Sequence, residues 1–277
     1  MNSTPDLCAM TGEYPKVSIC MPIYNRNNFK PLIIYNLQNF CYPGRDKLEL
    51  VIDDDGTDRF FKDNIELETF KKAIAPIRVK YFTYNKRRSI GFKRNNLIKL
   101  ASHKHYAQMD SDDVYMPSYI QYSIETLKIG KKTLVGTNQM IFVYPFDNFK
   151  MTGIQCSGKR QIHEASMVFT KQHFRSMGGF VSKGEGASKG EGAKMVDFND
   201  NNCGLTECHL VMMCVCHDSN TVLKDVFKDK SEVTGTLAPM LIDVLNECIS
   251  IPLPENKNHQ NQSEPLTPPP PLPLIQN

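Results

Sequence analysis

Acidic side chains gather at two points of the chain, and each group follows a short apolar run. Asp110–Asp113 comes directly after Tyr106–Met109, and Asp53–Asp58 comes directly after Leu48–Ile52. Three carboxylates within four residues repel one another unless a cation neutralises them. Mg²⁺ and Mn²⁺ are commonly bound through one or two carboxylates together with substrate phosphates. The first group therefore indicates a divalent-cation site; the alternative is a solvated acidic turn before a helix that begins near Pro117.

The second acidic group and a basic segment offer contacts for a nucleotide. Asp54 and its neighbours can accept hydrogen bonds from a base or ribose, although Asp-Gly and Thr-Asp pairs are also common in turns. Lys86–Arg88 and the pair Lys93-Arg94 form the concentrated basic patch of the sequence. A helix start that bears Arg94 beside a strand-end pocket can pair with a diphosphate. The alternative is a solvated helical face.

A parallel sheet would bring these groups together. The predicted strands are Val17–Met21, Leu48–Ile52, Ile77–Phe82 and Tyr106–Met109, and the predicted helices are Phe29–Asn39, Phe60–Ala73, Phe92–Ala101 and Pro117–Ile129. Strands that alternate with helices in this way favour an α/β fold with a mostly parallel central sheet and helices on both faces. Ligands of such sheets bind at the carboxyl ends of the strands. We therefore expect Ile23–Arg26 and the two acidic groups to form one site.

Beyond residue 130 the pattern is strand-like, with no visible linker. The expected elements are strands at Thr133–Val135, Gln139–Tyr144 and Ser166–Thr170 and a helix at Lys171–Met177. We predict an N-terminal arm (1–15), one domain (16–250) with halves at 16–130 and 131–250, and a tail (251–277). Eight of the 17 prolines fall in the last 26 residues, so the tail is expected to be disordered and extended. It is either a spacer or a ligand for a proline-motif-binding partner.

Composition excludes several classes of protein. The 277 residues carry 33 Lys and Arg against 30 Asp and Glu, so no nucleic-acid partner is expected. No apolar run approaches the roughly 20 residues of a transmembrane segment, and the first residues show no secretory signal. The nine cysteines are an odd number without framework spacing. They indicate reduced thiols and hence a cytoplasmic location.

The order of the motifs resembles glycosyltransferase family 2. The residues that carry the resemblance are PIYNR at 22–26, DDGTD at 54–58, GFKRN at 91–95 and MDSDD at 109–113. The match is strong over Lys16–Tyr119 and weak elsewhere. It implies a Rossmann-like, nucleotide-diphospho-sugar transferase domain of the GT-A type.

The resemblance also implies roles for individual residues. The nucleotide-binding residues would be Pro22, Tyr24, Asn25, Asp53, Asp54, Arg94, Asp110 and Ser111. Because the second acidic group has an extra aspartate, Asp53 and Asp54 remain alternatives for the nucleobase contact. Asp110 and Asp112 would be the Asp-x-Asp pair, with Asp112 as the direct ligand of Mn²⁺ or Mg²⁺. His217, after the apolar run Val211–Cys216, resembles a further metal ligand; the alternative is a turn residue.

An inverting transferase needs a carboxylate base that takes the proton of the acceptor hydroxyl, and such a base typically contributes about 10²–10⁴-fold in rate. The family places it in a Glu/Asp motif after a Gly-Gly-Phe turn, here Gly178–Phe180. An exact tandem hexapeptide, SKGEGA, then occupies 182–193. Glu185 keeps the upstream spacing and Glu191 the downstream spacing, so both are candidates, with Glu191 preferred and Asp197 third. The alternative is a polar loop without a catalytic carboxylate.

The combined expectation is a metal-dependent, inverting glycosyltransferase. It would move a sugar from a nucleotide-diphospho-sugar, first of all a UDP-sugar, to a hydroxyl of a glycan, protein or lipid acceptor. A sugar nucleotidyltransferase is one alternative, but it normally needs a glycine-rich loop after the first strand, where residues 22–28 contain no glycine. A catalytically inactive nucleotide-sugar-binding or glycan-binding module is the other, because the GEG loop is disturbed by its duplication.

Overall fold

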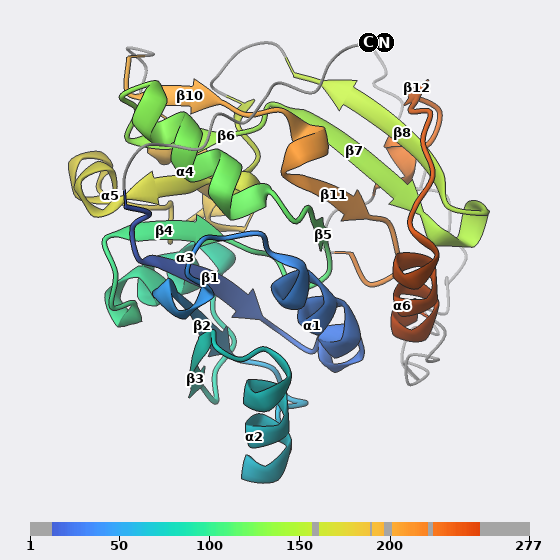
Figure 1. Ribbon diagram of the computed structural model, residues 1–277, viewed down its shortest axis with the longest axis horizontal. Coiled ribbons are helices and arrows are strands. Elements are labelled where there is room, and N and C mark those ends of the chain that lie inside the picture. The colour runs from blue at the N-terminus through green and yellow to red at the C-terminus, as the bar shows by residue number, and fades with distance from the viewer. Residues whose placement is uncertain (1–12, 157–160, 189, 197–200, 221–223, 250–277) are drawn as a thin grey trace, which may run out of the picture.

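A seven-stranded sheet forms the centre of the computed structural model, which describes residues 13–156, 161–188, 190–196, 201–220 and 224–249 (Figure 1). In the order β10-β6-β9-β4-β1-β2-β3, the strands are Cys203–Leu205, Leu134–Gly136, Val168–Thr170, His105–Gln108, Val17–Ile23, Leu48–Asp54 and Arg78–Thr83. β1 runs parallel to β2 and β4, and β2 runs parallel to β3. β9 is antiparallel to both β4 and β6. The predicted strands are present, with their ends shifted by one or two residues.

Alternate residues of the central strands enter two different cores. Ile19 and Met21 of β1 pack on one face, in the core that contains residues of α1 (Lys30–Asn39), α2 (Asn64–Ala73) and α4 (Tyr119–Ile129). Cys20 packs on the other face, with residues of α3 (Ile90–Leu100) and α5 (Lys171–Met177). Because β1 and β2 are buried on both faces, both faces carry apolar side chains, and the buried Ser18 hydroxyl donates to Glu49 at 2.6 Å. The expected α/β sheet with helices on both faces is thus confirmed.

A second, five-stranded sheet lies to one side of the large one (Figure 1). Its order is β12-β8-β7-β11-β5, formed by Ser231–Glu232, Lys150–Gln155, Gln139–Tyr144, Met212–Val215 and Val114–Tyr115. Helix α6 (Pro239–Ile249) packs on this sheet and on α1 through Leu241 and Leu245, which share a core with Val143 and Val215. After β11, the His217 ring lies with its centroid 4.7 Å from that of Phe29, the residue before α1.

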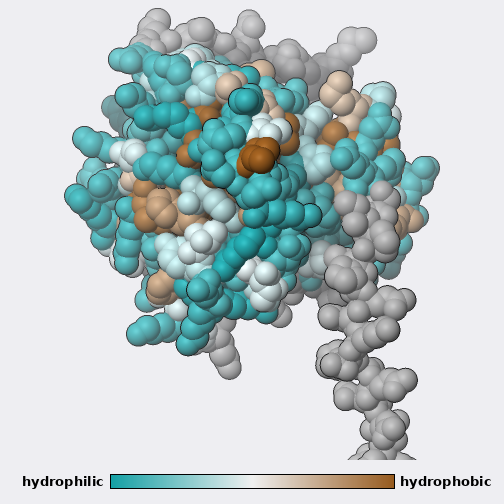
Figure 2. All heavy atoms as spheres, turned by 90° about the horizontal axis from the view of Figure 1, so that it is seen from below, coloured by the Kyte–Doolittle hydropathy of each residue, from teal (hydrophilic) through white to brown (hydrophobic). Residues whose placement is uncertain are grey.

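Large exposed apolar side chains are scattered over the surface: Ile65, Phe92, Ile129, Phe146, Leu205, Val226 and Met240. The face seen in Figure 2 is mostly hydrophilic, with separate apolar spots. Among the helices of the described ranges, none combines the length and the apolar character that a membrane crossing requires. The expected tail (251–277) and residues 1–12 of the expected arm lie outside the described residues, so the division into arm, domain and tail stays a prediction.

Candidate functional site

Parallel pairing brings the motifs to one edge of the large sheet. In the registers of the three central strands, Ile23 of β1 lies opposite Asp54 of β2, and Cys20 lies opposite Gln108 of β4. The segments that follow these strands, Tyr24–Arg26, Asp55–Asp58 and Met109–Asp113, therefore leave the sheet side by side. The three segments therefore lie at one edge of the sheet, as predicted.

Asp54 shapes the turn after β2. Its Oδ1 accepts a hydrogen bond from the Gly56 N–H at 2.9 Å, and its Oδ2 accepts from the Phe60 N–H at 2.9 Å and the Tyr81 hydroxyl at 2.6 Å. Asn25 approaches the same turn so closely that a Cβ on Gly56 would lie 2.7 Å from Asn25 Oδ1. Glycine is therefore required at position 56, and Asp54 holds the turn that presents its neighbours.

The other two aspartates of this turn bind cations. Asp53 is hydrogen-bonded by Arg88 and, at 2.8 Å, by Asn96. Asp55 accepts from Lys93 Nζ at 2.7 Å and from the Arg88 backbone N–H at 2.6 Å. Burial lowers the pKa of Lys93, and the charge of Asp55 opposes this. Lys93 also donates to the last carbonyl of β1 at 2.9 Å, so it ties β1, β2 and α3 together.

The predicted nucleobase side is flanked by the basic segment. Pro22 lies within β1, opposite Asp53, and Tyr24 is the first residue after the strand. The Arg87 guanidinium carbon lies 4.1 Å from the Tyr24 ring centroid. The basic patch is expected beside a diphosphate. In the structure its Arg87 instead stacks on Tyr24, the ring that the resemblance assigns to the nucleobase.

Arg94 is the centre of a buried polar network. Its three guanidinium nitrogens donate to Glu191 Oε1 at 2.9 Å, Gln108 Oε1 at 3.0 Å and Asp110 Oδ1 at 3.0 Å. The arginine is 2% exposed and Glu191 is 5% exposed. Burial raises the pKa of Glu191, against the lowering effect of Arg94. Arg94 therefore joins α3, the end of β4 and the duplicated loop into one unit.

Asp112 and His217 face each other across the site. Asp112 Oδ2 lies 3.2 Å from His217 Nε2 and 3.2 Å from Arg26 Nε. Burial alone would raise the pKa of Asp112, but the bond to His217 and the charge of Arg26 lower it below its ordinary value. On the far side of the ring, Ser219 Oγ lies 2.8 Å from Nδ1 and orients the imidazole. Arg26 belongs to the Ile23–Arg26 segment expected at the site, but the sequence pattern predicts no role for its side chain.

Asp113 links the acidic loop to β11, the strand that ends just before His217. β5 and β11 pair through Val114 and Met213, and Asp113 Oδ1 accepts the Val215 N–H at 3.0 Å. The same oxygen lies 3.4 Å from Lys224 Nζ. Burial, opposed by Lys224 and reinforced by the neighbouring aspartates, raises the pKa of Asp113 to about 6. The third carboxylate of the cluster thus anchors the second sheet.

The Asp112–His217 pair has the chemistry and spacing of two neighbouring metal ligands. Adjacent ligands around an octahedral ion with bonds of about 2.1 Å lie about 3 Å apart, and the two atoms are 3.2 Å apart. No group of three His, Cys, Asp or Glu side chains suited to a metal ion occurs in the described part of the chain. A metal at this point would therefore take its remaining ligands from substrate and water.

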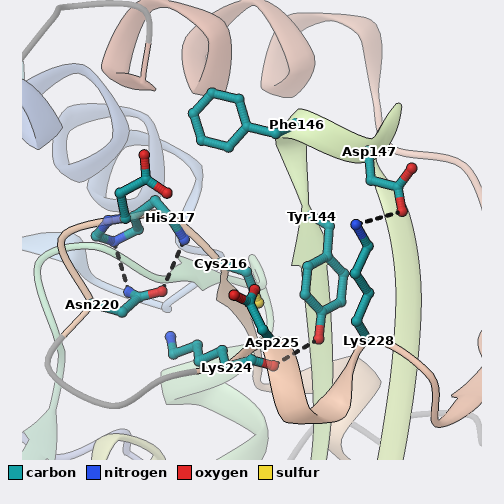
Figure 3. A pocket seen from close by; sticks show the side chains of 10 residues that line it. Tyr144, Phe146, Asp147, Cys216, His217, Asn220, Lys224, Asp225 and Lys228 are labelled. Atoms are coloured by element: carbon teal, nitrogen blue, oxygen red, sulfur yellow. Dashed lines mark hydrogen bonds and ion pairs between the residues drawn. The ribbon is translucent and has the colours of Figure 1, made fainter.

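A cavity of about 290 Å³ opens beside His217 (Figure 3). Its walls include the aromatic rings of Tyr144 and Phe146 and the ammonium groups of Lys224 and Lys228. It lies where β7 and β11 of the second sheet end, beside His217. The site thus has room for a ligand beyond the acidic loop.

The duplicated hexapeptide forms two short 3-10 helices, Glu185–Ala187 and Glu191–Met195. The second contributes Glu191 to the Arg94 network. The side chain of Glu185 and the whole of Asp197 lie outside the described residues. Ser111, between the two aspartates of the motif, is buried. The structure therefore brings together Arg94, Asp110 and Glu191 on one side and Asp112 and His217 on the other.

Comparison with known proteins gives three findings. The family profile described as Glycosyl transferase family 2 matches residues 18–183. Over 88 residues the chain is 38% identical to the probable glucomannan 4-beta-mannosyltransferase 7 of Oryza sativa subsp. japonica, a stretch that spans 32% of this chain and only 14% of that relative. The solved structures described next resemble the chain at identities that concern the fold alone.

The mannosyltransferase PcManGT from Pyrobaculum calidifontis, in complex with GDP-Man and Mn²⁺, aligns with a TM-score of 0.57 and 16% identity, over 85% of this chain and 69% of that one. S. aureus TarS 1-349, in complex with UDP-GlcNAc, aligns with a TM-score of 0.55 and 14% identity, over 74% of this chain and 60% of that one.

Proposed function

The chain belongs to glycosyltransferase family 2, and we propose that it transfers a sugar from a nucleotide-diphospho-sugar to an acceptor hydroxyl, with inversion at the anomeric carbon and dependence on a divalent metal. The observation that carries this proposal is the approach of Asp112 Oδ2 to His217 Nε2, 3.2 Å apart, at the carboxyl edge of the sheet. Asp112 lies between β4 and β5, His217 follows β11, and the two residues are 105 positions apart in the chain. A carboxylate and an imidazole in this place are suited to a metal that also binds a diphosphate.

Asp112 and His217 would hold Mn²⁺ or Mg²⁺, and the donor diphosphate would complete the coordination. When bound, the metal would neutralise the charge that develops on the departing diphosphate. The Mn²⁺ named with the structural neighbour PcManGT supports this choice. Arg26, which already lies 3.2 Å from Asp112, would remain the nearest protein cation to the leaving group.

The nucleoside would bind beside Pro22 and Tyr24, at the edge flanked by Arg87 and Asp53. We propose a UDP-sugar as donor, in keeping with the UDP-GlcNAc named with TarS, and a GDP-sugar as its first competitor, because GDP-Man is named with PcManGT. Asn25, Asp54, Arg94, Asp110 and Ser111 would contribute by shaping this edge, because the side chains of Asp54 and Arg94 form hydrogen bonds inside the protein.

The acceptor would reach the sugar from the side of the duplicated loop and the second sheet. From the sequence alone, Glu191 and Glu185 are the candidates for the base. A glycan, protein or lipid hydroxyl is compatible with the cavity next to His217, which offers aromatic, acidic and basic walls.

A panel of nucleotide sugars tests the proposal. Each donor is incubated with the protein and Mn²⁺, with water as the acceptor, and the released nucleoside diphosphate is measured. We expect slow release from at least one donor and a loss of at least about 100-fold in Asp112→Asn. Asp46→Asn, an exposed aspartate beyond the opposite end of β2, is the matched control and should keep the wild-type rate. If the wild type turns over no donor while it binds nucleotide, the chain is a binding module and the proposal fails.

A further inference from the structure

The second copy of the hexapeptide has no room for a side chain at Gly192, because Glu164 fills that space. A Cβ on Gly192 would lie 2.4 Å from Glu164 Cγ and 3.1 Å from its Oε1. The same oxygen accepts a hydrogen bond from the Gly192 N–H at 3.2 Å. At Gly186, the equivalent position of the first copy, the nearest atom would be Val181 Cγ1 at an ordinary 3.4 Å. Glu164, 28 residues away in sequence, thus brings a second carboxylate to this loop.

Glu164 is also fixed relative to the acidic loop that follows β4. It begins the 3-10 helix Glu164–Ser166. The carbonyl of the next residue, Ala165, accepts a hydrogen bond from the Tyr115 hydroxyl at 3.1 Å, and that hydroxyl accepts from the Asp110 N–H at 2.8 Å. Tyr115 is 1% exposed. One buried tyrosine therefore holds the helix of Glu164 against the Asp110 backbone.

The carboxylates of Glu191 and Glu164 differ in their partners. Glu191 forms an ion pair with Arg94, whose Nε donates to Glu191 Oε1 at 2.9 Å, and it is 5% exposed. Glu164 is partly exposed, and within the described residues it forms no ion pair. Burial, opposed by Arg94 and reinforced by the charge of Glu164, raises the pKa of Glu191, as expected for two carboxylates close together. Glu191 is thus buried and held by Arg94, whereas Glu164 is the carboxylate of this pair that an acceptor hydroxyl can reach.

We propose that Glu164 is the catalytic base of the transfer and that Glu191 is a positioning residue that holds Arg94. The Glu164 carboxylate takes the proton of the acceptor O–H while the acceptor oxygen bonds to the anomeric carbon. The bond from that carbon to the diphosphate oxygen breaks, and its electron pair leaves with the nucleoside diphosphate. The proton on Glu164 then passes to solvent. This inference rests on the proposed function and deepens it.

Three variants test the assignment through metal-dependent donor hydrolysis: Glu164→Gln, Glu191→Gln and the control Glu68→Gln on the exposed face of α2. Glu164→Gln should lower kcat about 10²–10⁴-fold, leave the donor KM within about threefold, and remove the acidic limb of the pH–rate profile, which reports ionisation of the base. Glu191→Gln should keep that limb and lose mainly thermal stability. A Glu164→Gln variant with wild-type kcat and an intact acidic limb overturns the assignment.

A second experiment exchanges the side chains of the two touching positions. Glu164→Gly removes the carboxylate, and Glu164→Gly combined with Gly192→Asp returns one to the same space from the opposite chain segment. The double variant should hydrolyse donor at least tenfold faster than Glu164→Gly alone. A folded double variant that is no faster overturns the proposal. A wild type that turns over no donor overturns the proposed function as well, whereas an active wild type with an indifferent Glu164 overturns this inference alone.

Discussion

The two copies of SKGEGA have the same residues and each forms a short 3-10 turn, yet they differ in what surrounds them. In each copy the last alanine N–H donates to the first glycine carbonyl at 3.1 Å, and that glycine has a positive φ, +76° at Gly184 and +72° at Gly190. The second copy also binds Arg94 through Glu191 and packs on Glu164 through Gly192. Local sequence thus sets the turn, while side chains from α3 and from the segment before β9 give the second copy its place in the candidate site.

The largest expected effect on stability is that of replacing Glu191, the glutamate of the second copy. Glu191→Gln leaves the buried Arg94 guanidinium with one carboxylate, Asp110, instead of two, so we expect a loss of about 3 kcal/mol in the free energy of unfolding. Denaturant-induced unfolding measures it, with Glu68→Gln as the control that should change by less than about 0.5 kcal/mol. A Glu191→Gln protein as stable as the control would mean that the second copy is not built into the fold.

The second prediction compares the middle glycines. Gly192→Ala places a methyl group 2.4 Å from Glu164 Cγ, whereas Gly186→Ala places one 3.4 Å from Val181 Cγ1. We expect Gly192→Ala to cost about 2 kcal/mol, because Glu164 or the loop must shift, and Gly186→Ala to cost less than about 0.5 kcal/mol. Thermal or denaturant unfolding of the two variants side by side decides this; equal costs would contradict the asymmetry.

The third prediction compares the first glycines of the two copies. Gly184 and Gly190 both have a positive φ, and a Cβ on either would meet no atom within 4 Å. With ψ at 29°, Gly190 is left-handed helical, where alanine costs about 1 kcal/mol. With ψ at −171°, Gly184 is in a region that is essentially restricted to glycine, where alanine costs about 2 kcal/mol. Gly184→Ala should therefore lower the free energy of unfolding more than Gly190→Ala, and equal losses would contradict the difference in backbone conformation.

The smallest effect is expected for Glu185→Gln. The three guanidinium nitrogens of Arg94 donate to Glu191, Gln108 and Asp110, so the carboxylate that this loop gives to the network comes from the second copy. Donor hydrolysis by Glu185→Gln should stay within about threefold of the wild type. A loss comparable to that of Glu164→Gln would instead move the catalytic loop to the first copy.

Much of the large sheet could be predicted because its signals are local. The apolar runs at β1 and β2 are long enough to identify strands buried on both faces. The second sheet gave weaker signals, because β5 has only two residues and β8 (KMTGIQ) is largely polar. Helix α6 was not predicted either, although its buried Leu241 and Leu245 lie one helical turn apart.

Some residues of the candidate site could likewise be predicted from local signals, and others could not. The motifs around Asp110–Asp112 could be recognised from residue types after a strand, and His217 from its position after an apolar run. The pairing of Asp55 with Lys93 and the packing of Glu164 on Gly192 depend on contacts between distant segments. No local pattern marks Glu164, since its environment exists only once β9 lies beside β4 and the loop closes over α3.

The dependence of donor hydrolysis on Mn²⁺ tests the central claim most directly. With one donor that the wild type turns over, the initial rate is measured as Mn²⁺ is raised from a chelator-treated start, in the wild type and in His217→Ala. We expect no turnover without metal, saturation as Mn²⁺ increases, and a half-saturating concentration at least about tenfold higher in His217→Ala. A rate that is the same with chelator as with Mn²⁺ would contradict a metal site at Asp112 and His217.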